Sequence, residues 1–393
     1  MSERKTHIVV IGGGYAGVLA ANHLQKAAGA DITLVNPRPK FVERIRLHQL
    51  VAGNDDATED YHNLLGERVR LVVDGAQRID TAARLVRLTS GATLAYDYLI
   101  YAVGSTGAVP ASVPGAAEHA YPLSEYEQAT RLHARLQTVE ASAPVVVVGA
   151  GLTGIEAASE LAEAGRPVTL VTDQLAPSVG DATRRSLARQ LARLGVNILE
   201  GVTVSAVEAC AVRLTDGNRL PSAVTVWTAG FGVPGLAADS GLRTDALGRL
   251  LTDETLTSVD DPCIVGTGDA VSPSGIPLRM SCQAAGPLGI QAAQTVLARI
   301  DGAQPADIRQ AFTGQCISVG RHLGAVQLSH GDDTPRRFYF GGRTAALLKE
   351  QVCRATLMFM RREGRKPGSY LWLKSDWRDE RLDRLPRQDV LTR

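Results

Sequence analysis

The residues of this chain whose types and spacing most directly indicate chemistry are six glycines. They follow the G-x-G-x-x-G spacing twice, as Gly12, Gly14 and Gly17 and again as Gly149, Gly151 and Gly154. Glycines at this spacing permit a tight turn, let backbone N–H groups approach a pyrophosphate and let a helix pack closely on a strand. The partial positive charge at the N-terminus of the following helix also favours phosphate. Each cluster therefore predicts a dinucleotide-binding turn.

Both glycine clusters stand between a predicted strand and a predicted helix, which is the context that this motif requires. Residues 7–11 and 145–148 are largely apolar runs, typical of strands buried on both faces of a parallel sheet. A segment with helical apolar spacing follows each cluster, and further strands are predicted at 32–35 and 168–171. The pattern predicts an α/β protein with two Rossmann-like dinucleotide-binding domains.

The residue that ends the second strand of such a unit normally binds ribose hydroxyls through a carboxylate. In the first unit this residue is Asn36, which can donate and accept hydrogen bonds but carries no charge. In the second unit it is Thr172, and Asp173 follows directly. After Asn36, Arg44 or Arg46 could reach the pyrophosphate. The alternative is that both arginines belong to an ordinary surface loop.

Three other segments suggest where a ligand would approach the backbone. Two strands end in small residues, at Ala102–Gly104 and at Ala229-Gly230, so the two halves of the chain are similar in design. A later apolar strand ends at Gly268-Asp269, where a carboxylate stands beside a backbone that permits close approach. Such a carboxylate suits sugar or ribityl hydroxyls. A Gly-Asp pair alone is a common turn, and its significance here depends on the two preceding dinucleotide units.

Turn and helix signals give further boundaries. A Pro-, Gly- and Ser-rich connector at 105–115 marks the first expected domain boundary. A helix is predicted from Ser124, because Glu127 stands in capping-box spacing to it. An Ala- and Gln-rich helical stretch is predicted over 279–298, with an interruption at Gly286-Pro287.

Charge is distributed unevenly along the 393 residues. The net charge is +1, but residues 334–393 hold 15 Lys and Arg against 7 Asp and Glu, whereas the rest of the chain holds 27 against 34. A basic C-terminal segment on an acidic body suggests an anionic partner such as a lipid surface. The alternative is a solvated, salt-bridged tail. No nucleic-acid partner is expected.

The cysteines and the apolar segments exclude several classes of protein. The five cysteines show no C-x-x-C pair and no Cys/His pattern at zinc spacing, so we expect no metal site and instead buried free thiols in a reducing compartment. The first strand begins by His7, which leaves no room for a signal peptide. No run of 18 apolar residues occurs, so a membrane-spanning helix is not expected. The expected location is cytoplasmic.

Taken together, the two glycine units, the two strands that end in Ala and Gly, and Gly268-Asp269 resemble the flavin-dependent pyridine-nucleotide-disulfide oxidoreductase superfamily, over roughly residues 6–345. No redox-active cysteines stand near the first unit, so a disulfide reductase is not expected. Within the superfamily, the chain looks most like the type II NADH:quinone oxidoreductases. Ferroptosis-suppressor-protein-like and apoptosis-inducing-factor-like flavoproteins are neighbouring groups.

The resemblance implies a domain organisation. Residues 1–112 and 241–314 would form an FAD-binding domain, 113–240 an inserted NAD(P)H-binding domain, and 315–393 a C-terminal domain. The cofactor-binding residues that the resemblance carries over are Gly12, Gly14, Gly17, Asn36, Arg44, Gly104, Gly149, Gly151, Gly154, Thr172, Asp173, Gly230, Gly268 and Asp269.

Two residues match catalytic positions of the family. Glu156 matches a glutamate near the nicotinamide–flavin stack, and the alternative is an acidic residue that the helix dipole favours in a first helical turn. Gln283 matches the first of two glutamines that line the acceptor site of the quinone reductases. The second is replaced around Gly286-Pro287. The N-terminus of that helix is expected to face the flavin pyrimidine ring.

Residues 345–366 are predicted to form a basic amphipathic helix. Apolar residues at helical spacing are flanked by basic ones, namely Ala345, Leu348, Val352, Ala355 and Phe359 with Lys349, Arg354, Arg361 and Arg362. Such a helix lies on an anionic bilayer, and type II quinone reductases attach to membranes through their C-terminal region. The alternative is a helix packed on its own sheet or on a second subunit, as in a homodimer.

The expected activity is that of an FAD enzyme that takes hydride from NAD(P)H and reduces a quinone-type acceptor, at the inner face of the membrane if 345–366 attaches there. NADH is expected to be weakly favoured over NADPH, because neither Thr172 nor Asp173 is a firm acidic partner and no arginine follows them directly. One alternative is a ferredoxin or rubredoxin reductase that docks a small protein on the basic tail. Another is a flavoprotein that acts mainly by redox-dependent binding of partners.

Overall fold

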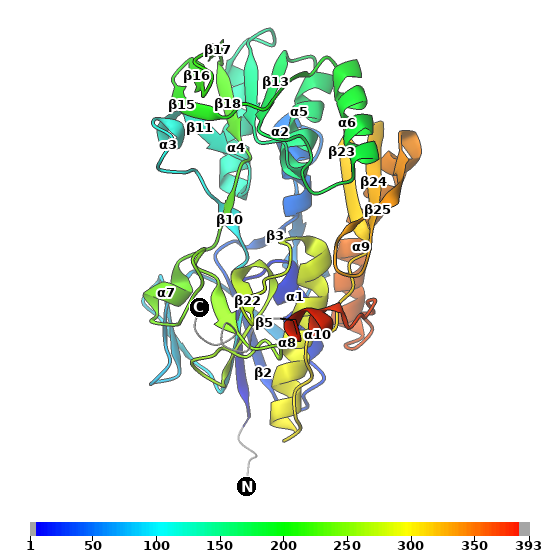
Figure 1. Ribbon diagram of the computed structural model, residues 1–393. Coiled ribbons are helices and arrows are strands. Elements are labelled where there is room, and N and C mark those ends of the chain that lie inside the picture. The colour runs from blue at the N-terminus through cyan, green and yellow to red at the C-terminus, as the bar shows by residue number, and fades with distance from the viewer. Residues whose placement is uncertain (1–4, 385–393) are drawn as a thin grey trace.

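The computed structural model describes residues 5–384, which form two α/β lobes with the C-terminal part of the chain along one side (Figure 1). The lower lobe contains a five-stranded parallel sheet with the order β21-β9-β1-β2-β5. Its strands are β1 (His7–Ile11), β2 (Asp31–Asn36), β5 (Val69–Val73), β9 (Tyr98–Tyr101) and β21 (Ile264–Gly266). Because β21 comes from late in the chain and yet pairs with β9, the polypeptide leaves this lobe and returns to it.

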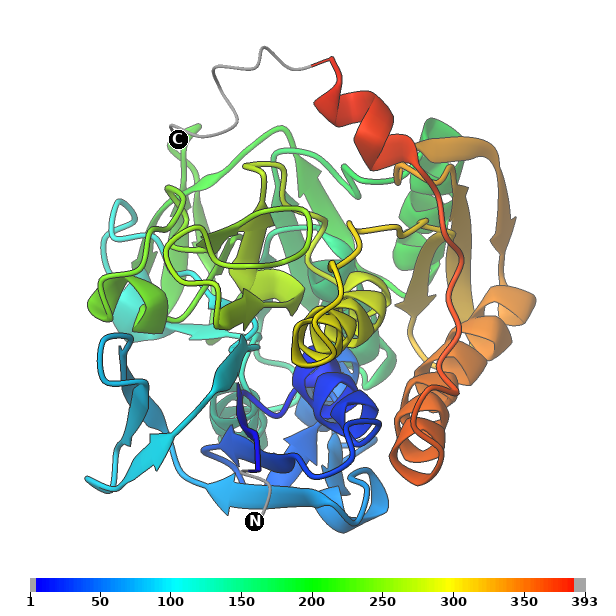
Figure 2. The same ribbon diagram turned by 90° about the horizontal axis from the view of Figure 1, so that it is seen from below.

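Two helices cover the lower sheet and pack against each other, α1 (Tyr15–Leu24) and α8 (Cys282–Ile300) (Figure 2). They approach closely because the contact is made by small residues. A Cβ at Gly289 of α8 would lie only 2.4 Å from the carbonyl oxygen of Ala16 of α1. The strands and both helices share one continuous apolar core, so β1, its turn and α1 are held rigidly.

The upper lobe repeats this design with the strand order β11-β18-β12-β13-β14, again all parallel. Its strands are β11 (Ala120–Pro122), β12 (Val145–Val148), β13 (Val168–Thr172), β14 (Asn197–Glu200) and β18 (Val224–Trp227). Its helices are α4 (Tyr126–Thr138), α5 (Leu152–Glu163) and α6 (Asp181–Arg193). The predicted fold class, with two Rossmann-like units and the second inserted in the first, is confirmed.

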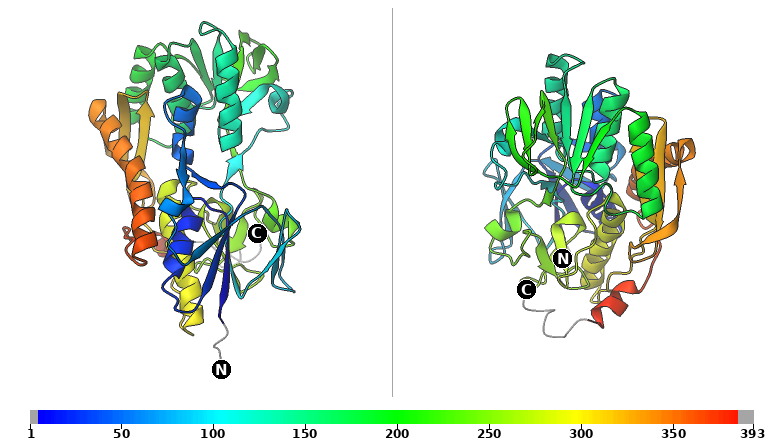
Figure 3. Two further views of the ribbon diagram at one scale, coloured as in Figure 1. Left: turned by 180° about the vertical axis from the view of Figure 1, so that it is seen from behind. Right: turned by 45° about the horizontal axis from the view of Figure 1, so that its top comes forward.

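The C-terminal part begins with an antiparallel sheet of β23 (Gly314–Val319), β24 (Leu323–Ser329) and β25 (Pro335–Gly341). This sheet contacts α5 and α6 of the upper lobe. The long helix α9 (Arg343–Arg365) packs on the same sheet and extends down to α1 of the lower lobe (Figures 1 and 3). Beyond α9 the chain reaches α10 (Trp377–Leu382). The C-terminal part therefore contacts both lobes.

The remaining elements are short. They are β3 (Lys40–Val42), β4 (Thr58–Asp60), β6 (Ala76–Asp80), β7 (Leu85–Leu88), β8 (Thr93–Ala95), β10 (Thr106–Gly107), β15 (Val204–Glu208), β16 (Ala211–Leu214), β17 (Arg219–Pro221), β19 (Phe231–Gly232), β20 (Leu250–Thr252) and β22 (Val271–Pro273), with the helices η1 (Arg44–Arg46), α2 (Leu47–Ala52), η2 (Tyr61–Asn63), α3 (Ala116–His119), α7 (Leu236–Asp239) and η3 (Gly268–Ala270). β10 pairs with β19, so the two connections between the lobes run side by side. α2 reaches up from the lower lobe to pack on α4 and α5 (Figure 3).

The predicted capping box at Ser124 and Glu127 is wrong. α4 begins at Tyr126, and no side chain caps its N-terminus. Arg38 donates hydrogen bonds to the carboxylates of Glu125 and Glu127, at 3.0 and 2.6 Å. Because Arg38 holds the Glu127 carboxylate, that side chain does not reach back to the start of the helix.

The predicted interruption at Gly286-Pro287 is also wrong, since α8 continues through both residues. Proline lacks the N–H that would donate to the carbonyl of Gln283, four residues earlier. The side-chain Nε2 of Gln310 donates to that carbonyl instead, at 3.2 Å. A side-chain donor supplied by a distant residue therefore satisfies the group that proline leaves free.

The five cysteines are all free thiols, but only Cys353 is buried, so the expectation of buried thiols holds for that residue alone. Within residues 5–384, no helix is long and apolar enough to span a membrane. The same part of the chain contains no group of three or more His, Cys, Asp or Glu side chains placed to hold a metal ion.

Candidate functional site

The first glycine turn joins β1 to α1 in a conformation that requires glycine. Gly12 has φ +104°, and a Cβ there would lie 2.2 Å from the carbonyl oxygen of Ala102. A Cβ at Gly17 would lie 1.8 Å from the carbonyl oxygen of Gly12. Gly14 is the N-cap of α1, without a side-chain cap, and a Cβ there would meet no atom within 4 Å. The first N–H groups of α1 therefore face open space, as binding of a phosphate requires.

The second glycine turn repeats this geometry between β12 and α5. Gly149 has φ +96°, and a Cβ at Gly154 would lie 1.8 Å from the carbonyl oxygen of Gly149. Gly151 is the uncapped N-cap of α5, and a Cβ there would again meet nothing within 4 Å. Thr228, just before Gly230, donates its hydroxyl to the carbonyl of Gly149 at 2.8 Å. The end of β18 is thus fixed against the turn.

A cavity of about 330 Å³ opens over the first glycine turn. Asn36 lines it and braces the turn, because its Oδ1 accepts from the N–H of Gly13 at 3.0 Å and its Nδ2 donates to the carbonyl of Arg38 at 2.8 Å. The hydroxyl of Tyr61 donates to the carbonyl of Gly13 at 2.8 Å. Arg38, Lys40 and Glu125 also line the cavity, and Arg38 donates to the Glu125 carboxylate at 3.0 Å. The uncapped N–H groups suit the pyrophosphate of a dinucleotide.

The structure brings Arg44 and Asp269 together at one end of this cavity. Nη1 of Arg44 donates to Oγ of Ser105 at 3.0 Å, and that hydroxyl donates to Oδ2 of Asp269 at 2.7 Å. Oδ1 of Asp269 accepts from the N–H of Ser281, the N-cap of α8, at 3.2 Å. Gly104 lies beside Arg44. The predicted residues of the first unit therefore meet the start of α8 around one cavity wall.

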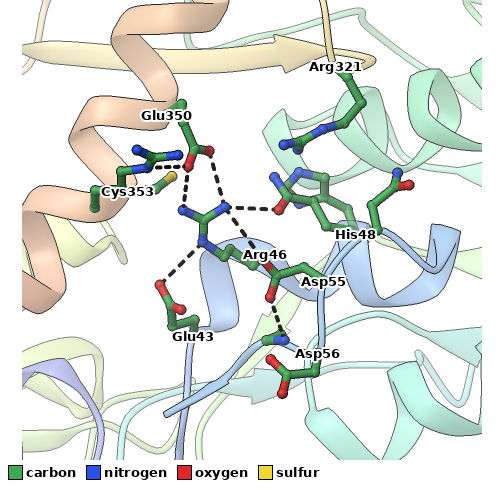
Figure 4. Close-up of polar contacts among 12 residues, drawn as sticks. Glu43, Arg46, His48, Asp55, Asp56, Arg321, Glu350 and Cys353 are labelled. Carbon is green, nitrogen blue, oxygen red and sulfur yellow. Dashed lines mark hydrogen bonds and ion pairs between the residues drawn. The ribbon is translucent and has the colours of Figure 1, made fainter. Parts of the chain in front are cut away.

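Arg46 does not lie in this cavity. Its guanidinium donates to both carboxylate oxygens of Glu350 on α9 at 3.1 Å and to Glu43 at 3.3 Å, with Asp55 at 3.8 Å (Figure 4). Arg46 is buried, and these carboxylates occupy its donors. The sequence predicted that Arg44 or Arg46 would bind the pyrophosphate. Of these two residues, Arg44 alone lines the cavity.

In the second unit the hydroxyl of Thr172 is engaged by the protein. It accepts from the N–H of Ala150 at 3.3 Å and donates to the carbonyl of Gln174 at 2.9 Å. Asp173 is exposed beside it. Sequence reasoning missed Glu200, which pairs with Thr172 in the strand register. The carboxyl ends of adjacent parallel strands lie at the same edge of a sheet, so the end of the next predicted strand would have indicated Glu200.

Glu156 lies in a buried polar cluster rather than at a helix start. α5 begins at Leu152 and has no acidic residue in its first turn, so the explanation by the helix dipole does not apply. The carboxylate accepts from the N–H and hydroxyl of Ser318 at 3.1 and 3.2 Å, and Nζ of Lys349 on α9 lies 3.0 Å away. Burial disfavours the charged carboxylate, but Lys349, His48 and Ser318 together hold the pKa of Glu156 below its usual range.

His48 completes this cluster from the opposite side. Its Nδ1 lies 3.7 Å from Glu156 and its Nε2 lies 4.0 Å from Glu160, and Nε2 has no hydrogen-bond partner. Burial lowers the pKa of His48 to about 4, reinforced by Lys349 and other cations and opposed by Glu156. The imidazole is therefore neutral near pH 7. Arg321 contacts Glu160 at 3.4 Å, at the solvent side of the cluster.

The side chain of Lys349 points into the protein, whereas the sequence pattern predicted that it would point outward. At the sequence level it flanks an apolar helix face, but the structure places its ammonium group inside, against Glu156 and the carbonyl of Cys316 at 3.3 Å. Burial opposes the charged form, yet the attraction of Glu156 raises the pKa of Lys349 well above its usual range. No local pattern distinguishes an inward from an outward lysine at the margin of an amphipathic helix.

Gln283 stands in the first turn of α8, as predicted. Its side-chain amide contacts Thr313 and, with the amide oriented to satisfy its neighbours, donates to the carbonyl of Gly314 at 3.0 Å. In the second turn, a Cβ at Gly286 would lie 2.3 Å from the hydroxyl of Tyr370. Tyr370 therefore occupies the space beside α8 that a side chain at Gly286 would fill.

α9 presents two different faces. Its inner face packs on the sheet and on α1 through residues such as Cys353 and Met360. The predicted apolar face is displaced from this buried face, so Leu348 and Val352 are exposed. Leu347 and Met358 of α9 are exposed as well, and so are four large apolar residues elsewhere in the C-terminal part: Phe338, Phe340, Leu371 and Leu373. Packing and an exposed apolar surface thus coexist on one helix.

Comparison with known proteins agrees with this geometry. The family model described as pyridine nucleotide-disulphide oxidoreductase matches residues 6–295. An NADH dehydrogenase-like protein of Mycobacterium tuberculosis is 33% identical over 323 residues, which cover 74% of this chain and 80% of the relative. A type II NADH:quinone oxidoreductase of Staphylococcus haemolyticus is 26% identical over 398 residues, covering 90% and 95%.

The similar proteins also include a ferredoxin reductase component and a solved NADH-bound structure. The ferredoxin–NAD(+) reductase component of the p-cumate 2,3-dioxygenase system of Pseudomonas putida is 32% identical over 293 residues, covering 70% of each chain. The solved structure of NDH2 from Plasmodium falciparum in complex with NADH superposes with a TM-score of 0.77 at 16% identity, covering 92% of this chain and 99% of that one. This last similarity concerns the fold. By its family match and its relatives, the chain belongs to the pyridine nucleotide-disulphide oxidoreductases, as an NAD(P)H-dependent flavin oxidoreductase.

Proposed function

We propose that this protein oxidises NADH and reduces a quinone-type acceptor. The observation that carries this proposal is the buried Lys349–Glu156 ion pair, which α9 and α5 bring together. Reduction of a quinone to a quinol takes two electrons and two protons, and NADH supplies both electrons but only one proton, within the hydride. A one-electron acceptor such as ferredoxin takes no proton. A buried lysine that stays charged can stabilise the negative charge that develops on a quinone oxygen before that oxygen takes up a proton from solvent, and ferredoxin does not require this.

FAD, when bound, would accept the hydride and pass the electron pair on. The cavity residues fit this cofactor, because the uncapped start of α1 and the cations Lys40 and Arg44 suit its pyrophosphate. Asp269, which accepts hydrogen bonds from Ser105 and Ser281, would bind ribityl hydroxyls. We assign Gly12, Gly14, Gly17, Gly104 and Gly268 to the same site.

The dinucleotide that donates the hydride would bind at Gly149, Gly151 and Gly154, with Gly230 lining the turn. NADH is favoured because Asp173 and Glu200 both stand at the carboxyl ends of adjacent strands. A 2′-phosphate at this edge would meet two carboxylates, whereas ribose hydroxyls can donate to them.

The domain boundaries follow from the same assignment. Residues 1–112 and 241–314 would bind FAD and 113–240 the nicotinamide dinucleotide, with the paired β10 and β19 as the crossing between them. The C-terminal domain would be 315–393, of which 385–393 lie outside the described residues. Its exposed apolar residues and basic side chains would rest on an anionic membrane surface at the cytoplasmic face, where a quinone is available. A second copy of the chain is the alternative cover for this face.

Anaerobic stopped-flow measurements test the proposal. The protein reduced by NADH is mixed with a water-soluble quinone, with ferredoxin or with ferricyanide, and reoxidation is followed by flavin absorbance. We expect the quinone to reoxidise the wild type, and Lys349→Met to slow this step about tenfold or more while ferricyanide reduction is unchanged. Rapid reoxidation by ferredoxin alone would overturn the choice of acceptor. Equal slowing with both quinone and ferricyanide would mean that Lys349 does not stabilise the reduced quinone.

A further inference from the structure

Helix α8 lacks one main-chain hydrogen bond near its N-terminus. Pro287 is its sixth residue, and the missing N–H leaves the carbonyl of Gln283 without its helical partner. Ser281 caps the same end, and its N–H donates to Asp269. The defect is thus in the turn that joins the cofactor cavity to Gln283.

Gln310 repairs this defect from outside the helix. Its Nε2 donates to the Gln283 carbonyl at 3.2 Å, and the residue is only 1% exposed. Its Oε1 is buried without a partner. A buried unpaired oxygen is unfavourable, and a methionine of similar length would avoid it. The glutamine is therefore explained by its donor atom rather than by packing.

The C-terminal segment holds Gln310 in place. The indole N–H of Trp377 donates to the carbonyl of Gln310 at 2.8 Å, and that of Trp372 donates to the carbonyl of Arg309 at 2.8 Å. The N–H of Ala311 donates to the carbonyl of Leu373 at 2.9 Å. Three main-chain groups in succession are thus fixed, and the donor atom of Gln310 is aimed at α8.

We propose that Gln310 is a positioning residue for the acceptor half of the reaction. Its amide replaces the main-chain bond that Pro287 removes, and it thereby fixes the first turn of α8 and the main chain of Gln283. This inference rests on the proposed function, which places the acceptor at Gln283. Hydride transfer from NADH, on the side of the second glycine turn, does not depend on Gln310.

A rescue experiment on the holoenzyme tests this role. Gln310→Met removes the amide, and Pro287→Ala restores the main-chain N–H. We expect Gln310→Met to raise the KM for quinone and to slow reoxidation roughly fivefold, the effect of one lost hydrogen bond, without changing the rate of reduction by NADH. Hydrogen exchange of the first turns of α8 should accelerate. The double variant Gln310→Met/Pro287→Ala should recover wild-type values in both measurements.

Gln291 provides a matched control on the same helix. It is also buried, and its Nε2 donates to the carbonyl of Ala306 at 2.8 Å. Gln291→Met should lower the melting temperature without changing the quinone KM. If Gln310→Met behaves like Gln291→Met, or if Pro287→Ala does not rescue it, the positioning role is overturned.

Two further measurements keep the test decisive. If Gln310→Met does not fold, the shorter Gln310→Asn, which cannot reach Gln283, enters the same rescue cycle. If the wild type is reoxidised by ferredoxin and not by quinone, the proposed function fails. The hydrogen-exchange rescue, which uses no acceptor, still decides whether Gln310 holds the turn.

Discussion

At the scale of single residues, the main feature is a set of ionisable side chains buried where the upper lobe meets the C-terminal part, two of them charged and one, His48, neutral near pH 7. Glu156, Lys349 and His48 come from α5, α9 and α2, so none of them is near another in the sequence. Each would be costly to bury alone, and their mutual contacts offset the loss of hydration. A buried pair of this kind is strongly destabilising when one partner is removed.

Lys349→Met should therefore destabilise the protein by roughly 3 kcal/mol, because it leaves the Glu156 carboxylate buried without its cation. Glu156→Gln should have a cost of the same order. The double variant should lose less than the sum of the two, since neither charge is then left alone. Urea unfolding of all four proteins measures the coupling, and strict additivity would mean that the two charges do not stabilise each other.

His48 makes stability depend on pH in a defined window. Its pKa is lowered from 6.5 to about 4 by burial, so between these values the unfolded chain binds a proton that the folded chain does not. Stability should therefore fall as pH falls through this window, by roughly 2 kcal/mol between pH 7 and pH 5. His48→Leu should flatten this part of the profile. The exposed His62 is the control, and His62→Leu should leave the profile as in the wild type.

At the scale of elements, each strand–turn–helix unit separates two kinds of glycine. Gly17 and Gly154 are required for folding, because a Cβ at either would lie 1.8 Å from the carbonyl oxygen of the first glycine of its cluster. Gly14 and Gly151 are open to solvent and carry no conformational strain. The first kind builds the turn, and the second leaves space for the ligand.

Gly14→Val should fold normally and lose FAD, since the branched side chain would occupy space in front of the uncapped N–H groups of α1. Gly17→Val should instead destabilise the fold itself. Flavin absorbance after gel filtration, with the melting temperature of the apoprotein, distinguishes the two. Full flavin occupancy in Gly14→Val would remove this turn from the FAD site.

The proposed preference for NADH is tested at the adjacent ends of β13 and β14. Asp173→Ala should narrow the preference for NADH over NADPH by roughly 1–2 kcal/mol, the contribution of one charged hydrogen bond. Glu200→Gln should act in the same direction because it stands at the same edge. Ratios of kcat/KM for the two nucleotides measure this. A wild-type preference for NADPH of about tenfold, or 1.4 kcal/mol, would contradict the assignment.

At the scale of the whole molecule, α9 binds the two lobes together with one face and exposes apolar side chains with another. Phe359 is a poor probe of the exposed face, because it is half-buried and packs edge-on against Tyr370 at 5.7 Å between ring centroids. Leu347 and Leu348 are better probes, being 67% and 44% exposed. A charge introduced there tests the surface without disturbing the packing.

Leu347→Asp and Leu348→Asp should release the protein from anionic vesicles and leave the melting temperature unchanged. Wild-type binding should weaken with salt, because nearby basic residues contribute about 1 kcal/mol each. Leu247→Asp is the matched control, since Leu247 is 41% exposed on a different part of the surface. Co-sedimentation measures binding. If the wild type binds no vesicles and the α9 variants convert a dimer to a monomer, a second copy of the chain covers this face.

The sequence by itself determined both dinucleotide units, because their signals are local: an apolar strand, a glycine turn and a helix lie within one short segment each. It also determined the α/β class and the element order around β1 and β12. Tertiary structure alone decided which polar and charged side chains point inward and which groups they contact. Lys349 faces Glu156 rather than solvent, Arg46 holds Glu350 rather than a cofactor, and Gln310 completes a helix to which it does not belong. These outcomes depend on long-range packing that offsets desolvation, and no local pattern contains that information.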